Sequence, residues 1–381
     1  MTAHAPPAHD RLIVSISDFE LGDGTLFDDF PQSEWAADLL MRWAHPRYRD
    51  VPIDLVLNGD TFDFSKTHLD GKHPHIVDEA VALARLGRIA EAHQPFLQAL
   101  GQLLVSGSAP RQVYFVTGNH DFELAFPAVQ KVIRNLIGRP EQVHFPGLQL
   151  QLGPVHFEHG AQHDAMFQID ASQPFIEHEG RQILNLPWGT VALAQTVMPY
   201  QAALFHLDRV KPKPILLERV PEAQTWMAAL FKQYWTRDYL RDLIFTRDPL
   251  KRLSWPMIKE LLKRFTSMNA DVQLDLGAGA WLHDWSRPQV TVVGHVHEPS
   301  LWTYGHRRVI QTGCIRNEFV IGEGDDLWLC PKSFAELYLD GDRISGVALR
   351  EVEGPPLPEG YIPQPLSAYR RTFQDLLDQM E

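Results

Sequence analysis

Cysteine is almost missing from this chain, with only Cys314 and Cys330 among 381 residues. Two cysteines build neither a disulfide framework nor a cysteine-rich zinc site. The N-terminus lacks a basic segment followed by an apolar one, so we expect no secretory signal and a cytoplasmic location. Residues 182–207 contain no charged side chain, but Asn185, Pro187 and several glutamines interrupt the run. We therefore expect packed helices there and no membrane span.

Positive charge is also in the minority, with 35 Lys and Arg against 48 Asp and Glu and a formal net charge of -13. Such an acidic surface repels polyanions, so we expect no stable double-stranded nucleic-acid partner. Residues 203–266 reverse the balance, with 13 basic against 7 acidic residues. Within them, 250–265 has the pattern of a basic amphipathic helix, which leaves peripheral contact with a membrane open.

Short apolar runs alternate with helical patterns along the chain. The runs that end at Gly or Ser and read as buried strands are 11–17, 53–59, 112–118 and 289–294. The helical patterns between them are 33–44, a long one within 76–105, and 123–138. Residues 148–160 are typical of a hairpin. This alternation predicts an α/β fold.

Residues 165–285 interrupt the strand pattern with helical, aromatic-rich sequence that holds six of the ten tryptophans. We predict that they form a helical insert or lid, although aromatic residues at helical spacing also suit an ordinary core. The insert divides a catalytic domain made of residues 1–164 and 286–352. A proline-rich tail, 353–381, ends in a short helix.

Polar residues follow every predicted strand. In chain order these are Asp18 and Glu20, Asp60 and Asp63, Asn119, His120 and Asp121, His159, and finally His295 and His297. Ligands of open α/β sheets bind beyond the carboxyl ends of the strands, so these side chains should face one crevice. Taken singly, each is as well explained by a turn or a helix cap. Together, the carboxylates, the amide and the imidazoles predict a metal site with oxygen and nitrogen ligands.

The chain resembles the calcineurin-like metallophosphoesterase family in the order and spacing of its motifs. These are Asp18…Gly59-Asp60-x-x-Asp63…Gly118-Asn119-His120-Asp121…His159-Gly160…Gly294-His295-x-His297. The resemblance covers the chain from residue 12 to about residue 317, apart from the insert. It implies a four-layer α/β/β/α sandwich with two metal ions at the strand ends. It also implies that Asp60 bridges both ions, that Asp18 and His297 hold one, and that Asn119, His159 and His295 hold the other.

The chemistry of such a set can be argued from the residue types. Two cations ~3.5–4 Å apart lower the pKa of a bridging water, and the resulting hydroxide attacks phosphorus. His120 is placed to protonate the leaving group, with Asp121 next to it to orient the ring. Asp63 is a candidate to hold a metal ligand in position. The expected reaction is hydrolysis of a phosphomonoester, phosphodiester or pyrophosphate bond.

The first motif departs from the family, which usually has Asp-x-His where this chain has Asp18-Phe19-Glu20. A Glu20 ligand makes the site harder and favours Mn²⁺, with Mg²⁺, Fe and Zn²⁺ as further candidates. The alternative is that Glu20 points away and the first metal is weak.

Four further residues are weaker candidates. His163 and Asp164 extend the His159-Gly160 motif and would touch substrate or support a ligand, unless they only begin a helix. Arg316 and Asn317 follow a predicted strand and would contact a phosphate.

The substrate class follows from the insert, where basic residues beside aromatic ones suit an anionic group joined to an apolar or flat one. We expect a phosphorylated small molecule, a nucleotide or a lipid phosphate. One alternative is a lipid pyrophosphatase of the UDP-diacylglucosamine type at a membrane surface. Those related enzymes are shorter and typically have Arg where this chain has His120. The other alternative is a non-catalytic binding scaffold that the metal stabilises.

Overall fold

The computed structural model describes residues 9–259 and 289–380, apart from 240, 242–244, 246, 247, 252, 256 and 362. Half of the basic pattern 250–265, including all of 260–265, therefore falls outside the described residues.

A six-stranded sheet forms the centre of the molecule, in the order β16-β15-β1-β2-β3-β4. Its parallel part consists of β1 (Arg11–Ile16), β2 (Ile53–Asn58), β3 (Arg111–Val116) and β4 (Val143–Gly147). The long strands β15 (Lys332–Asp340) and β16 (Arg343–Val352) extend it in antiparallel fashion next to β1. The three predicted N-terminal strands are thus neighbours that run the same way.

A five-stranded sheet packs against the first one, in the order β11-β12-β10-β6-β5. Its strands are β5 (Gln149–Leu152), β6 (Val155–Glu158), β10 (Val290–Val293), β11 (Pro299–Tyr304) and β12 (Arg307–Thr312). The predicted hairpin is the antiparallel pair β5–β6, and β10 is parallel to both β6 and β12. The carboxyl ends of β6 and β10 consequently lie side by side.

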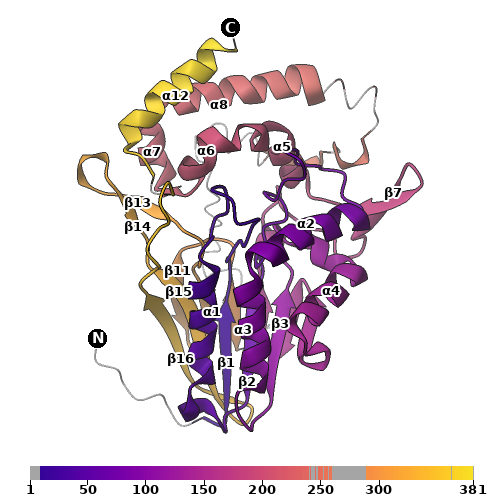
Figure 1. Cartoon of the computed structure of the whole chain (residues 1–381), viewed down its shortest axis with the longest axis vertical. Helices are drawn as coiled ribbons and strands as arrows, with labels where there is room; N and C mark the ends of the chain where they lie inside the picture. The colour runs from indigo at the N-terminus through magenta and orange to yellow at the C-terminus, as the bar shows by residue number, and fades with distance from the viewer. Residues whose placement is uncertain are drawn as a thin grey trace.

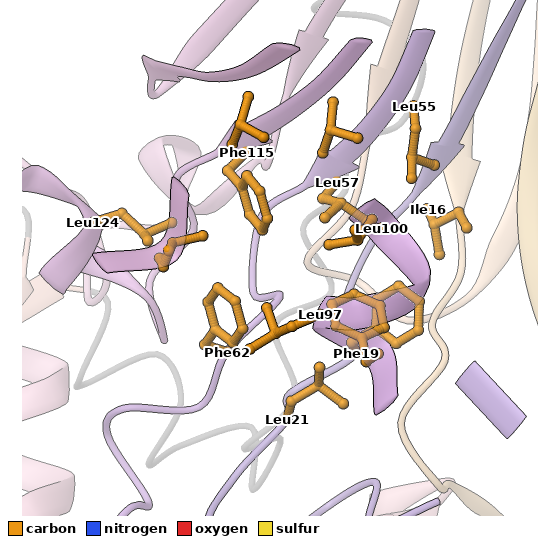
Figure 2. Close-up of a cluster of buried hydrophobic side chains, with 14 of the residues drawn as sticks. Ile16, Phe19, Leu21, Leu55, Leu57, Phe62, Leu97, Leu100, Phe115 and Leu124 are labelled. Atoms are coloured by element: carbon orange, nitrogen blue, oxygen red, sulfur yellow. The ribbon is translucent and has the colours of Figure 1, made fainter. Parts of the chain in front are cut away.

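The period of two along each strand divides the core between the faces of the first sheet. Ile13, Val56 and Val116 face the second sheet and pack with Phe157 and Val292. The alternate residues pack under four helices. These helices are α1 (Ser33–Met41), α2 (Glu79–Ala92), α3 (Gln94–Val105) and α4 (Pro127–Ile137). Figure 2 shows Ile16, Leu55, Leu57 and Phe115 among the side chains of this cluster, with Leu97 and Leu100. The predicted α/β sandwich is confirmed.

The long helical pattern within 76–105 is two helices, because α2 ends at Ala92 and α3 begins at Gln94. Between them His93 is fully buried, and its Nε2 lies 2.8 Å from Asp28 Oδ2. A buried imidazole held by a distant carboxylate leaves no trace in helical periodicity, so the sequence could not show the break.

The predicted insert contains α5 (Trp188–Thr196), α6 (Gln201–Asp208), α7 (Lys213–Arg219) and α8 (Pro221–Gln233). It also contains strands: the hairpin β7 (Phe175–His178) and β8 (Arg181–Leu184), and the short β9 (Val210–Lys211). β9 pairs with β13 (Phe319–Ile321), which pairs with β14 (Leu327–Leu329).

The helices of the insert lie above the sandwich in Figure 1, together with the C-terminal helix α12 (Leu366–Asp378). α12 is the predicted last helix, and its Phe373 packs against the buried Trp226 of α8 with ring centroids 5.5 Å apart. No helix among the described residues is both long enough and apolar enough to cross a membrane.

Candidate metal centre

The carboxyl ends of five parallel strands bring the predicted ligands together. Asp18, Asp60 and Asn119 lie two or three residues beyond β1, β2 and β3 in the first sheet. His159 follows β6 directly, and His295 lies two residues beyond β10 in the second sheet. Because both sheets end at the same side, side chains from both converge there.

The backbone at these strand ends is strained. Positive φ angles occur at Asp18 (54°), Glu20 (50°), Asp60 (50°), His295 (67°) and His297 (59°). Among the described residues, these are five of the eight non-glycine residues with positive φ. Left-handed backbone is costly for residues with a Cβ and persists where the surrounding structure enforces it, most often at functional sites. Every one of the five is a predicted ligand.

One ligand group consists of Asp60, His159 and His295, whose candidate atoms all lie within 4.8 Å of one another. His159 Nε2 is 2.9 Å from Asp60 Oδ2 and 3.2 Å from the amide oxygen of Asn119. The other ring nitrogen of His159, Nδ1, lies 3.1 Å from the carbonyl oxygen of Asn58. When Nδ1 donates to this carbonyl, the lone pair of Nε2 points to the carboxylate and amide oxygens.

The second ligand group consists of Asp18, Glu20 and His297, again within 4.8 Å. His297 Nε2 lies 3.1 Å from Asp18 Oδ1 and 3.6 Å from Glu20 Oε1. Asp18 Oδ1 also lies 4.0 Å from His159 Nε2, so Asp18 contacts histidines of both groups. The assignment of these ligands to two separate ions stays a prediction. The bridging role of Asp60 stays a prediction.

Glu318 was missed by the sequence analysis. Its Oε1 lies 2.8 Å from Nδ1 of His297, and its side chain is buried. A carboxylate on the remote nitrogen fixes the ring and its tautomer, so that Nε2 faces the ligand group. The signal was present in the sequence, since Glu318 directly follows the two candidates Arg316 and Asn317.

The buried carboxylates set the protonation of the histidines. Burial opposes the charging of His159, but Asp60 and Asp18 outweigh it and raise the pKa to about 9. For His297, burial and Arg316 oppose charging, yet Asp18 and Glu318 raise the pKa to about 9. For His295, by contrast, burial prevails and lowers the pKa. A divalent ion that binds here would displace the protons of His159 and His297, because an imidazole ligates in its neutral form. The carboxylates, imidazole nitrogens and amide oxygen form a donor set that fits divalent metal ions.

His120 lies beside these groups with its ring held by Asp63 and Ser65. Its Nδ1 is 3.0 Å from Asp63 Oδ1 and 3.0 Å from Ser65 Oγ, and its backbone N–H donates to Asp60 Oδ1 at 2.8 Å. Burial opposes the charging of His120, but Asp63 and Glu20 raise its pKa well above the ordinary value. Asp63 therefore supports the charged ring.

Asp121 does not take the place predicted for it. Its carboxylate accepts hydrogen bonds from the backbone N–H groups of Gly118 at 2.6 Å and Thr61 at 2.8 Å. The residue thus ties the loop after β3 to the loop after β2. The assignment of Asp121 as the group that orients the His120 ring is corrected, and Asp63 occupies that position.

Glu20 lies in its ligand group but is held by two cations. Nη1 of Arg316 donates to Oε2 of Glu20 at 2.8 Å and to Oε1 at 3.1 Å, and Lys66 Nζ lies 3.3 Å from Oε2. Burial would raise the pKa of Glu20, yet Arg316 and Lys66 hold it well below the ordinary value. The sequence left two alternatives open, that Glu20 binds a metal ion or that it points away. The side chain faces the site, and Arg316 and Lys66 already balance its negative charge.

Of the four weaker candidates, Asp164 and Arg316 lie beside the ligand groups, whereas His163 and Asn317 bond to other residues. Asp164 Oδ2 lies 3.7 Å from Nε2 of His295, whereas His163 pairs with Glu158 at 3.0 Å. Arg316 lines the cavity described next. Asn317 is fully buried, and its amide bonds to Gln32 and Lys332, a position that suits packing rather than a phosphate contact.

A cavity of about 630 Å³ opens over both ligand groups. The strand-end side of its lining includes Glu20, Asp60, Asn119, His120, His295, His297 and Arg316. The facing side comes from the insert and is largely apolar, with Leu193, Ala194, Val197, Met198 and Leu204. Its size is that of a small-molecule site, and its two walls differ in polarity.

No protein-family model matches the sequence, and no curated protein matches it either. Solved structures are similar to the chain in their architecture. A conserved uncharacterized protein from Streptococcus pneumoniae TIGR4, titled a predicted phosphoesterase, is 12% identical with a TM-score of 0.28, covering 91% of this chain and 93% of its own. Vacuolar Protein Sorting 29 from Cryptosporidium parvum is 12% identical with a TM-score of 0.28, over 91% and 100% of the two chains.

A third structure, Phosphopantetheinyl Hydrolase from Mycobacterium tuberculosis, is 14% identical with a TM-score of 0.28, over 80% and 90% of the two chains. These proteins have the calcineurin-like metallophosphoesterase fold, the fold that the motifs of this sequence predicted. At such low TM-scores the likeness carries no argument about chemistry. The function therefore has to be argued from the residues of this chain.

Proposed function

We propose that this chain is a metal-dependent phosphoesterase that hydrolyses a phosphomonoester, phosphodiester or pyrophosphate bond. The observation that supports it is the meeting of two ligand groups and a partly buried, carboxylate-supported His120 at the strand ends, under one cavity. A non-catalytic scaffold requires metal ligands, but it does not require the His120 imidazole that Asp63 and Ser65 position beside them.

The residues that would hold a metal ion are Asp60, Asn119, His159 and His295, and Asp18, Glu20 and His297 form the second ligand group of the same site. A bound divalent ion supplies a Lewis acid and a water of lowered pKa. We propose Mn²⁺, since carboxylate oxygens are prominent in the set.

His120 has the geometry of a proton donor. Asp63 and Ser65 occupy its Nδ1 and the residue lines the cavity, so Nε2 is the atom that would protonate the leaving oxygen of a phosphoester bound there. The hydrogen bond from its backbone N–H to Asp60 fixes the distance between the acid and the ligand group. A positioned acid of this kind contributes a factor of ~10²–10⁴ to the rate.

The test is turnover of bis-p-nitrophenyl phosphate by metal-stripped protein with Mn²⁺ added back. We expect His120→Ala and Asp60→Ala to abolish most of the activity, whereas His144→Ala retains it. His144 stacks on Tyr114 with ring centroids 4.9 Å apart and does not line the cavity, so it controls for the loss of a histidine. A wild type as inert as both variants, across substrates and metals, would favour the scaffold.

A second candidate is a lipid-linked pyrophosphate, because the apolar wall formed by Leu193, Val197 and Leu204 faces the ligand groups. An acyl chain would lie against this wall while its phosphate meets the polar side. We expect Leu193→Asn to lower kcat/KM for a nucleotide-linked lipid and to leave kcat/KM for p-nitrophenyl phosphate unchanged.

Membrane contact through 250–265 is tested separately. Binding of the protein to anionic rather than neutral vesicles would support it.

A further inference from the structure

The two ligand groups differ in the fixed positive charge beside them. Among the described residues, no Lys or Arg forms an ion pair with Asp60, whose partner is His159 at 2.9 Å. Glu20, in contrast, is fully buried and ion-paired with both Arg316 and Lys66. Asp60 thus has only an imidazole beside it, which can lose its proton to a metal ion, whereas Glu20 has two fixed cations in place.

The Arg316 guanidinium is held from several sides. Its Nε lies 2.8 Å from Glu318 Oε1, and its Nη1 lies 3.4 Å from Asp29 Oδ2 in addition to the contacts with Glu20. An arginine stays charged at every accessible pH, so deprotonation cannot make room for a metal ion. Displacing it would leave buried carboxylates without their partner.

We infer that this chain holds one divalent ion tightly, at Asp60, Asn119, His159 and His295, and that Arg316 with Lys66 supplies the positive charge at Glu20 in place of a second ion. A divalent ion against Glu20 would lie beside the guanidinium, and the two like charges would repel. The inference rests on the proposed function only in that both concern the same site.

The replacement has a consequence for the substrate. Arg316 lines the cavity, and Glu318 and Glu20 fix its guanidinium. Carboxylates take Nε and Nη1, so Nη2 is the nitrogen that would donate a charge-assisted hydrogen bond to a phosphate oxygen. Arg316 would therefore contact the phosphoryl group on the side where a second ion would otherwise sit.

The experiment measures the metal content of the full chain after loading with Mn²⁺ and removal of loosely bound ions. We expect about one Mn²⁺ per chain in wild type, with the electron paramagnetic resonance spectrum of an isolated ion. In Arg316→Met the cation nearest Glu20 is removed and only Lys66, 3.3 Å away, remains, so the ratio should rise toward two and the spectrum should show coupling between ions.

The matched control is Arg85→Met. Arg85 is likewise a buried arginine that lines the cavity, but it pairs with Glu123 at 3.0 Å, away from both ligand groups. We expect this variant to keep about one ion. Arg316→Lys, which retains the charge, should keep about one as well.

Two tightly bound, coupled ions in wild type would overturn the inference, and this holds even if Arg316→Met fails to fold. Hydrolysis by such a two-ion protein would still leave the proposed function standing. A wild type that binds one ion and is inert toward every phosphoester would support the inference and refute the proposed function.

Discussion

Gly59 offers the sharpest test of the ligand geometry. It joins β2 to Asp60 with a φ of 88°, and a Cβ built on it would lie 2.3 Å from Nδ1 and 2.4 Å from Cγ of the His159 ring. The His159 ring cannot shift without losing a contact, because Nδ1 lies 3.1 Å from the Asn58 carbonyl and Nε2 lies 2.9 Å from Asp60. Gly59→Ala therefore perturbs the site through a single methyl group.

Two effects should lower the free energy of unfolding in Gly59→Ala. Left-handed backbone disfavours any residue with a Cβ by ~1–2 kcal/mol. Forcing an extra carbon into a close-packed region costs a further ~1–3 kcal/mol. We expect a loss of about 2–5 kcal/mol in the free energy of unfolding when the site keeps its geometry. When the His159 ring gives way instead, the second effect becomes a loss of metal affinity on the order of 10-fold to 100-fold.

Gly71→Ala separates the two effects. Gly71 also has positive φ, 75°, but nothing lies within 4 Å of its added Cβ. This control should lose only ~1–2 kcal/mol, with unchanged affinity for Mn²⁺. Urea unfolding without metal measures the first quantity, and calorimetric titration with Mn²⁺ measures the second.

The reasoning fails if Gly59→Ala and Gly71→Ala are alike in both measurements. Equal values would mean that His159 does not pack on Gly59, and the position of its Nε2 among the ligands would then be wrong.

Three further predictions follow from the same geometry. Chelation should lower the unfolding midpoint, and Mn²⁺ at a hundred times its Kd should restore about 2.7 kcal/mol, as calorimetry with and without chelator will measure. Asp63→Asn should lower turnover by ~10-fold to 100-fold with the metal content unchanged, because His120 loses the carboxylate 3.0 Å from its Nδ1. Trp226→Ala should cost ~3–5 kcal/mol of stability, measured by denaturation, because the indole is buried against Phe373 of α12.

The strand ends could be predicted from the sequence because two local signals coincide there. Short apolar runs mark buried strands, and polar residues directly after them must lie at the carboxyl edge. This placed Asp60, Asn119 and His295 near one another without any knowledge of the fold. The structure confirms that these residues line one cavity.

Orientation could not be predicted in the same way. Asp63 and Asp121 both lie within a few residues of His120 or Asp60 in the chain. Which of them faces the ring depends on the path of the loops, and the Asp121 carboxylate is drawn to two backbone N–H groups instead. Pairs such as Glu20 and Arg316 are separated by 296 residues, so no periodicity or spacing connects them.

The carboxylate of Glu20 changes which cation binds at the end of β1. A neutral imidazole would bind a metal ion without adding charge, but Glu20 adds a buried negative charge near Asp18 and Asp29. That charge requires a cation. Arg316 meets the requirement and also bonds to Glu318, the residue that fixes the ring of His297. A metal ion that displaced Arg316 would therefore leave Glu318 with Lys211 as its partner at 2.5 Å, so the charge balance at Glu20 and the surroundings of His297 change together.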